Sequence, residues 1–150
     1  MRWTARNQKM AAQLQAIERG RKSAAEMRLV EARQLEETAC TSREKADDAL
    51  GAAEAHWTEH LRSGPVDLLL QQALAYSVLR REHELQQARR EEQGAEALVG
   101  RRLTEWRYAE AGVRSGEAIL KRGARTLSRR SDDSREHQIS ERSGWKWFKR

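Results

Sequence analysis

The sequence is short of the residues that break helices, cross-link chains or build membrane spans. Its 150 residues include one proline, one cysteine and one phenylalanine. Cys40 has no partner in the chain for a disulfide, and we expect no role for it. No stretch approaches the roughly 20 uncharged apolar residues that cross a bilayer, and the N-terminus lacks the apolar run of a signal peptide. We therefore expect a cytoplasmic protein.

Apolar bulk is also scarce. Aromatic residues make up 5% of the chain and charged residues 35%. With this composition the chain has too little apolar side-chain volume for a sizeable globular core. The sequence contains no glycine-rich phosphate loop, no nucleophile and base on a strand-turn-helix frame, and no carboxylates framed by a pocket. These absences predict a non-enzymatic protein without a cofactor, a metal or a small-molecule substrate.

One histidine pattern needs separate mention. His56 and His60 stand four residues apart with Glu59 between them, a spacing that puts both imidazoles on one face of a helix, as in some zinc sites. A catalytic zinc also needs a third ligand and an enclosed pocket, which a helical rod does not provide. We expect two ordinary histidines near a helix–helix seam.

What the chain does contain is a long heptad. Steps of alternating three and four residues describe a helix face that packs against another helix. Eleven of the seventeen positions are apolar, which predicts a long coiled-coil helix. The positions are Gln71, Leu74, Val78, Arg81, Leu85, Ala88, Glu92, Ala95, Val99, Arg102, Trp106, Ala109, Val113, Gly116, Leu120, Gly123 and Leu127.

The only proline divides the chain into two arms. Gly64 and Pro65 form a strong turn signal, so we expect one arm over about residues 4–62, a turn over 63–67 and a second arm over about 66–128. Arms of roughly 85 to 95 Å and similar length favour an all-α, antiparallel two-helix coiled-coil hairpin over residues 1–128. A kinked rod that dimerises is the competing geometry. The seam expected in the first arm is Met10, Leu14, Ile17, Ala24, Met27, Leu35, Ala39, Ser42, Ala46, Ala49, Ala53, Trp57 and Leu61.

The net charge of +6 is concentrated at the C-terminal end. Residues 1–120 contain 19 basic and 19 acidic residues, whereas residues 121–150 contain 10 basic and 4 acidic ones. We expect a basic tail over residues 129–150, starting with a polar linker or frayed helix end at 128–135. Trp145, Trp147 and Phe148 alternate with basic residues there, a combination that suits an acidic protein groove, an anionic membrane surface or nucleic-acid bases.

A short segment late in the second arm points to a family. The run Leu103-Thr104-Glu105-Trp106-Arg107-Tyr108-Ala109-Glu110, followed by Leu120-Lys121-Arg122, resembles the Trp-Arg segment and later leucine-rich stretch of the FliJ/YscO family. These are the central-stalk proteins of type III secretion ATPase complexes, flagellar or virulence-associated. The resemblance implies a helical hairpin whose terminal halves enter a ring-shaped secretion ATPase and whose turn reaches toward an export gate protein or export chaperones.

The resemblance also suggests where the partners would bind. The ATPase would meet a basic group at Lys121, Arg122, Arg125, Arg129 and Arg130. The gate or chaperones would meet a group near the turn, at Trp57, Leu61, Leu68, Leu70, Leu74 and Tyr76. Such a protein would be cytoplasmic and peripheral to the inner membrane.

Two other functions fit the same residues. A coiled-coil structural adaptor could use residues 145–150 to hold a membrane surface or an acidic partner. A nucleic-acid binder could use the basic C-terminal thirty residues, but the balanced charge of residues 1–120 offers no basic stripe along the shaft, which disfavours this alternative.

Overall fold

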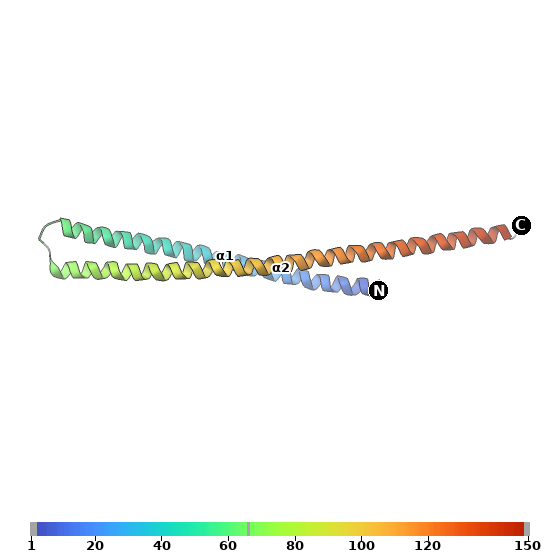
Figure 1. Cartoon of the computed structure of the whole chain (residues 1–150), viewed down its shortest axis with the longest axis horizontal. Coiled ribbons are helices and arrows are strands. Elements are labelled where there is room, and N and C mark those ends of the chain that lie inside the picture. Colours follow the sequence, from blue (N-terminus) through green and yellow to red (C-terminus); the bar gives the residue numbers. More distant parts are fainter. Residues whose placement is uncertain (1–2, 66, 149–150) are drawn as a thin grey trace. The chain divides into compact units, whose positions relative to one another are not determined.

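The computed structural model describes the backbone of residues 3–65 and 67–148 and the side chains of residues 3–65 and 67–142. It contains two helices, α1 (Ala5–Arg62) and α2 (Leu68–Phe148), joined by a short turn (Figure 1). The helices pack against each other in antiparallel fashion, which confirms the predicted all-α two-helix hairpin. Their contacts divide into unit 1, formed by Met1–Ala25 and Trp106–Arg150, and unit 2, formed by Glu26–Glu105.

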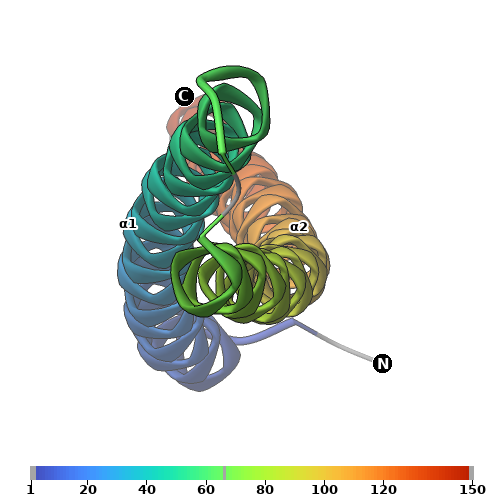
Figure 2. The same cartoon turned by 90° about the vertical axis from the view of Figure 1, so that its left-hand side faces the viewer.

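The turn lies where the glycine and the proline predicted it. Gly64 adopts a φ of 131°, a conformation that side chains with a β-carbon rarely tolerate. Asp67 then caps α2, because its Oδ1 accepts hydrogen bonds from the backbone amides of Leu69 at 3.0 Å and Leu70 at 3.3 Å. Figure 2 shows this turn joining the end of α1 to the start of α2. The cap therefore fixes the first turn of α2, which carries three successive leucines.

Unit 2 has an apolar seam with one ionic crossing. Leu29 and Ala32 of α1 and Leu85 and Ala88 of α2 are buried. Further along the seam, the Arg43 guanidinium of α1 donates to the Glu92 carboxylate of α2 at 3.1 Å (Nε to Oε2). Small residues alternate with large ones along this seam, which lets the two helices approach closely.

Unit 1 has a different seam, with polar side chains of α1 on glycines of α2. Gln15 is 3% exposed, and its Nε2 donates to the Val113 carbonyl at 3.0 Å. Gln8 donates in the same way to the Leu120 carbonyl at 3.3 Å. A β-carbon on any of three glycines of α2 would collide with a side chain of the α1 segment: Gly112 with Glu18, Gly116 with Gln15, and Gly123 with Trp3 and Gln8.

The prediction of which residues form the seam in the first part of α1 was wrong. Met10, Leu14, Ile17, Met27 and Leu35 are all exposed, as are Ala24, Ser42 and Leu61. The physical reason lies downstream, where the correctly predicted positions Ala39, Ala46, Ala49, Ala53 and Trp57 are half-buried. All of these except Ala49 lie on one strict heptad, which Glu36, Arg43 and Leu50 complete. Extending that heptad backwards gives Ala32, Leu29, Ala25, Lys22, Glu18, Gln15, Ala11 and Gln8, which are all buried or half-buried.

The seam predicted for α2 is confirmed at every position except Arg81, which is exposed. Arg81 instead donates to the carboxylate of Glu84, one turn along the same helix, at 2.8 Å. The long side chain of arginine reaches solvent from the edge of a seam, so this departure leaves the register unchanged.

The polar segment at 128–135 is helical, not a linker. α2 continues to Phe148, and residues 131–142 are exposed on every side. This stretch contains no proline or glycine, and Nε2 of His137 lies 3.4 Å from Oε1 of Glu141, four residues along the helix. The end of the heptad marks the end of helix pairing and not the end of the helix.

Candidate functional site

The turn end of unit 2 carries a group of exposed apolar side chains. Four of the residues expected there are exposed: Leu61, Leu68, Leu70 and, at 71%, Tyr76. Trp57 and Leu74 are half-buried in the seam and support the group from below. Leu68 and Leu69, held in the first turn of α2, are the most exposed leucines of this group at 71% and 79%. We call Leu61, Leu68, Leu69, Leu70, Tyr76 and Leu79 the turn-end patch.

Two members of the turn-end patch, Leu69 and Leu79, were not singled out from the sequence. The run of three leucines directly after a capping aspartate was the available signal, because one helical turn cannot bury three consecutive side chains against a single partner helix. Apolar side chains gathered in this way on a protein surface mark an interaction site more often than scattered ones do.

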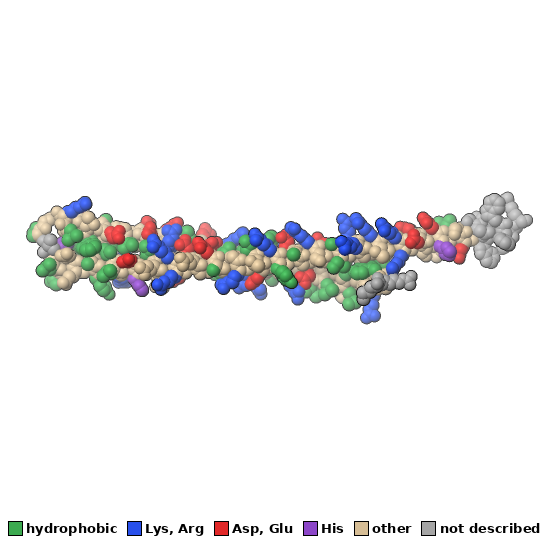
Figure 3. Space-filling model, viewed as in Figure 1, with side chains coloured by type: hydrophobic (Ala, Val, Ile, Leu, Met, Phe, Trp, Pro, Cys, Tyr) green, Lys and Arg blue, Asp and Glu red, His purple; other side chains and the backbone are tan. Residues whose placement is uncertain are grey.

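The basic group of unit 1 lies along the C-terminal part of α2. Lys121, Arg122, Arg125, Arg129 and Arg130 are all exposed. Arg130 also holds the start of the chain, because its Nη1 donates to the Trp3 carbonyl at 2.6 Å. Figure 3 shows basic side chains gathered over this part of α2. No acidic residue interrupts the sequence from 121 to 130, so the group presents a continuous positive surface.

Folding strengthens the charge asymmetry beyond what the linear sequence shows. Unit 1 contains 18 Lys and Arg residues and 7 Asp and Glu residues, because pairing adds the basic N-terminal segment to the basic C-terminal one. Unit 2 contains 11 and 16, respectively. Unit 1 is therefore strongly basic and unit 2 is acidic, a division that counting along the chain did not reveal.

Beside the unit 1 seam lies a shallow groove of about 510 Å³. The lining from α1 includes Ala11, Leu14 and Gln15, and α2 contributes Tyr108, Gly112, Gly116 and Ile119. Leu14, Tyr108 and Ile119 are exposed at its edge. Gly112 and Gly116 contribute backbone and no side chain to the wall of the groove.

Of the aromatic residues at the two ends of the chain, the structure describes the side chain of Trp3. Trp3 is half-buried over Gly123, and its Nε1 donates to the Gln8 side-chain oxygen at 2.9 Å. The expected tail residues Trp145, Trp147 and Phe148 lie outside the residues whose side chains are described.

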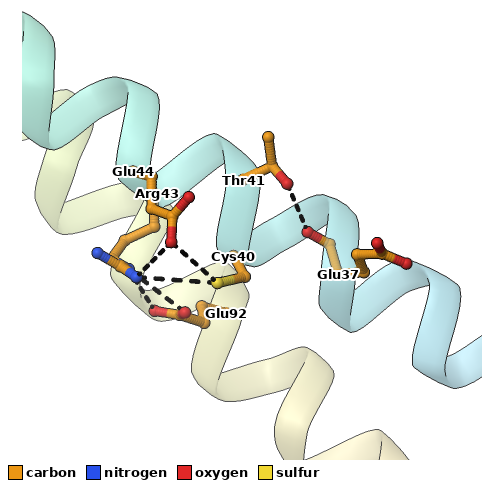
Figure 4. Close-up of polar contacts among 6 residues, drawn as sticks. All are labelled: Glu37, Cys40, Thr41, Arg43, Glu44 and Glu92. Atoms are coloured by element: carbon orange, nitrogen blue, oxygen red, sulfur yellow. Dashed lines mark hydrogen bonds and ion pairs between the residues drawn. The ribbon is translucent and has the colours of Figure 1, made fainter.

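Cys40 lies beside the interhelical ion pair of unit 2 (Figure 4). Its thiol donates to Glu44 at 3.7 Å and accepts from Arg43 at 3.8 Å. The hydrogen bond from Arg43 lowers the pKa of the Cys40 thiol, but partial desolvation and the carboxylates of Glu92 and Glu44 outweigh it, so this pKa is raised above its ordinary value. The arrangement keeps the thiol protonated and poorly nucleophilic at neutral pH.

Within the described part of the chain, no group of three or more His, Cys, Asp and Glu residues is placed to hold a metal ion. His56 and His83 are exposed, whereas His60 is half-buried and its Nε2 is enclosed without a hydrogen-bond partner. Across the same described residues, neither helix is long and apolar enough to cross a membrane.

Comparison with known proteins gives no further guide, since no family model, curated protein or solved structure matches the chain.

Proposed function

We propose that this chain is a non-enzymatic stalk or coupling component of a type III protein export apparatus. The observation that carries the proposal is a two-helix hairpin with two exposed surfaces of different character: a basic group in unit 1 and an apolar patch at the turn in unit 2. The resemblance to the FliJ/YscO family around Trp106 supplies the biological context. Such a protein would be cytoplasmic and peripheral to the inner membrane.

In this proposal, unit 1 enters the pore of a ring-shaped secretion ATPase. A pair of helices cannot contact six equivalent subunits equally, so it favours some subunit conformations over others if its affinity differs between them. The excess of positive charge in unit 1 suits an acidic pore lining. Exposed charges attract one another across water, so this association would weaken as salt is added.

The turn-end patch would bind the export gate protein or export chaperones. Its exposed leucines and tyrosine are typical of the apolar anchors at the centre of protein interfaces. Trp57 and Leu74 below the patch make a firm base for such a contact, because they are held in the helix seam.

The experiment that tests the ATPase contact is stimulation of a ring-shaped type III secretion ATPase by the purified chain. The purified chain should raise its hydrolysis rate at low salt and lose the effect as salt increases. Reversing three exposed charges of the basic group, with Arg122→Glu, Arg125→Glu and Arg129→Glu, should abolish stimulation.

A matched control has the same change in net charge elsewhere. Arg89→Glu, Arg90→Glu and Arg101→Glu alter exposed arginines of α2 in unit 2 and should leave stimulation intact. Equal loss in both triple variants, or no stimulation by the unmodified chain, would contradict the proposal. Light scattering should also find a monomer, because only a single hairpin fits within the pore of a hexamer.

A further inference from the structure

In unit 1, α1 packs its polar face on α2 and turns its apolar face to solvent. Gln15, at 3% exposed, is the most buried side chain of this face. Met10, Leu14 and Ile17 are each more than half exposed. A helix that pairs through water usually does the reverse, because burying apolar surface is the main favourable term in helix packing.

The two faces of α1 are offset by a single residue. Met10, Leu14 and Ile17 each come directly before a residue that faces α2, namely Ala11, Gln15 and Glu18. Successive residues of an α-helix are separated by about 100° around its axis. Rotating this segment by that angle, with a shift of about 1.5 Å along its axis, would therefore exchange the polar face for the apolar one.

We propose that α1 can pack on α2 within unit 1 in a second arrangement, in which the segment before Lys22 is rotated by one residue position. We call the two arrangements the observed seat and the second seat. Met10, Leu14 and Ile17 then face α2 in place of Ala11, Gln15 and Glu18. From Ala25 onward the seam is unchanged, so one extra residue must be accommodated between Arg21 and Ala25. A single π-type turn takes up one residue in this way.

The neighbourhood of the seam has room for the larger side chains. The groove of about 510 Å³ already has Leu14 on its edge, and Gly112 and Gly116 form part of its wall. Because glycine has no β-carbon, α2 leaves space at these two positions for an incoming leucine or isoleucine. Gly20, near the point where the rotation must begin, has no neighbour within 4 Å of an added β-carbon, so no side chain packs against α1 at that position.

Several contacts stabilise the observed seat, that is, the packing arrangement of α1 on α2 in the structure. Gln15 bonds the Val113 carbonyl, and Lys22 pairs with Glu110 at 3.5 Å and lies 5.7 Å from the centre of the Trp106 ring. Against this, Oε1 of Gln15 is buried without a hydrogen-bond partner, and three apolar side chains remain in water. The second seat removes both penalties but carries Arg21 toward α2.

The exchange regulates access to an apolar surface. In the observed seat, Met10, Leu14 and Ile17 are available to a partner, and in the second seat α2 itself covers them. A partner that binds these side chains holds the observed seat, and its release favours the second. This inference does not depend on the identity of the partner or on the proposed export function.

Thiol reactivity at two neighbouring positions tests the rotation. In a Cys40→Ser background, Met10→Cys places a thiol on the exposed face and Ala11→Cys places one on the half-buried face. In otherwise unmodified protein, a maleimide should react faster with Cys at position 10. Arg21→Leu replaces the one charged residue of the second seat, and it should reverse this order, with each rate changing by about tenfold in opposite directions.

Arg19→Leu is the matched control, because it also replaces an exposed α1 arginine with leucine and removes the ion pair with Glu117. It should leave the order of the two rates unchanged. Adding Leu14→Gln to Arg21→Leu should restore the original order, because it removes an apolar anchor of the second seat.

Two results would overturn the proposal. If Arg21→Leu speeds the reaction at position 11 and leaves position 10 unchanged, the helices separate and do not rotate. If Arg21→Leu changes neither rate, or acts as Arg19→Leu does, the second seat does not exist.

Discussion

The side chain of Gln15 on α1 occupies the space that a β-carbon of Gly116 on α2 would need. The same relationship links Glu18 with Gly112, and Trp3 with Gly123. These three glycines lie on the face of α2 that meets α1, at positions where an alanine would favour the helix but block its partner. In unit 1, the fit between side chains and glycines therefore defines how the two helices pair.

Replacing Gly116 with alanine should destabilise the protein even though alanine favours helix. The added methyl group must displace a buried glutamine, and overpacking of this kind costs about 1–3 kcal/mol. Gly20→Ala is the matched control in unit 1, since nothing lies near its added β-carbon, and it should stabilise by up to about 1 kcal/mol. Urea denaturation followed by circular dichroism measures both. Equal stabilisation by the two substitutions would show that Gln15 is not held at Gly116.

Polar substitution in the turn-end patch should leave the fold intact. Leu69 is 79% exposed, so Leu69→Ser should change the free energy of unfolding by less than about 0.5 kcal/mol. Leu85→Ala removes a buried side chain of unit 2 and should cost about 2–5 kcal/mol. If Leu69→Ser proves as damaging as Leu85→Ala in chemical denaturation, the patch packs within the chain and is not a free surface.

Removal of the α2 cap should loosen the start of that helix. Asp67→Ala loses the acceptor for the amides of Leu69 and Leu70, at a cost of about 1 kcal/mol. Asp67→Asn retains a side-chain acceptor and should be close to the unmodified protein. Amide hydrogen exchange at residues 69–71 should quicken in the alanine variant only. Unchanged exchange there would mean that the backbone of the turn holds this end without the cap.

The reactivity of Cys40 should report its electrostatic surroundings. The rate of alkylation by iodoacetamide should rise with pH around a midpoint above that of free cysteine, because the pKa of the thiol is raised. Glu92→Gln should lower the midpoint, since the Glu92 carboxylate disfavours the thiolate, whereas Glu96→Gln on the same helix should not.

The sign of the linked stability effect follows from the direction of this pKa shift. Folding favours the protonated thiol, so its contribution to stability is complete below the pKa of the unfolded chain. The contribution is lost as the pH rises through the pKa of the folded one. A midpoint at or below that of free cysteine would contradict this description of the site.

The sequence predicted those features that depend on strong local signals. Gly64 and Pro65 located the turn, and the heptad through Leu85, Ala88 and Val113 located the packed face of α2. In each case the apolar pattern and the packing requirement agreed, so one could be inferred from the other.

The first part of α1 could not be predicted in the same way. Its apolar residues Met10, Leu14 and Ile17 suggest one face, whereas the heptad continued from Trp57 and Ala53 requires another. The continued heptad prevailed, and it places Gln15 and Glu18 against glycines of α2 that lie about 100 residues away in the sequence. The basic unit 1 escaped notice for a related reason, since its charges come from both ends of the chain.

Antiparallel pairing also has a consequence for how the chain is made. The contact between Arg43 and Glu92 joins residues 49 apart in the sequence, whereas the contact between Trp3 and Arg130 joins residues 127 apart. Closing a longer loop costs more entropy, so helix pairing should start at the turn and spread outward like a zipper. The N-terminal segment of α1 is synthesised before the rest of the hairpin and is therefore the last part of it to pair. Until then its exposed Met10, Leu14 and Ile17 are the side chains that a chaperone would meet first.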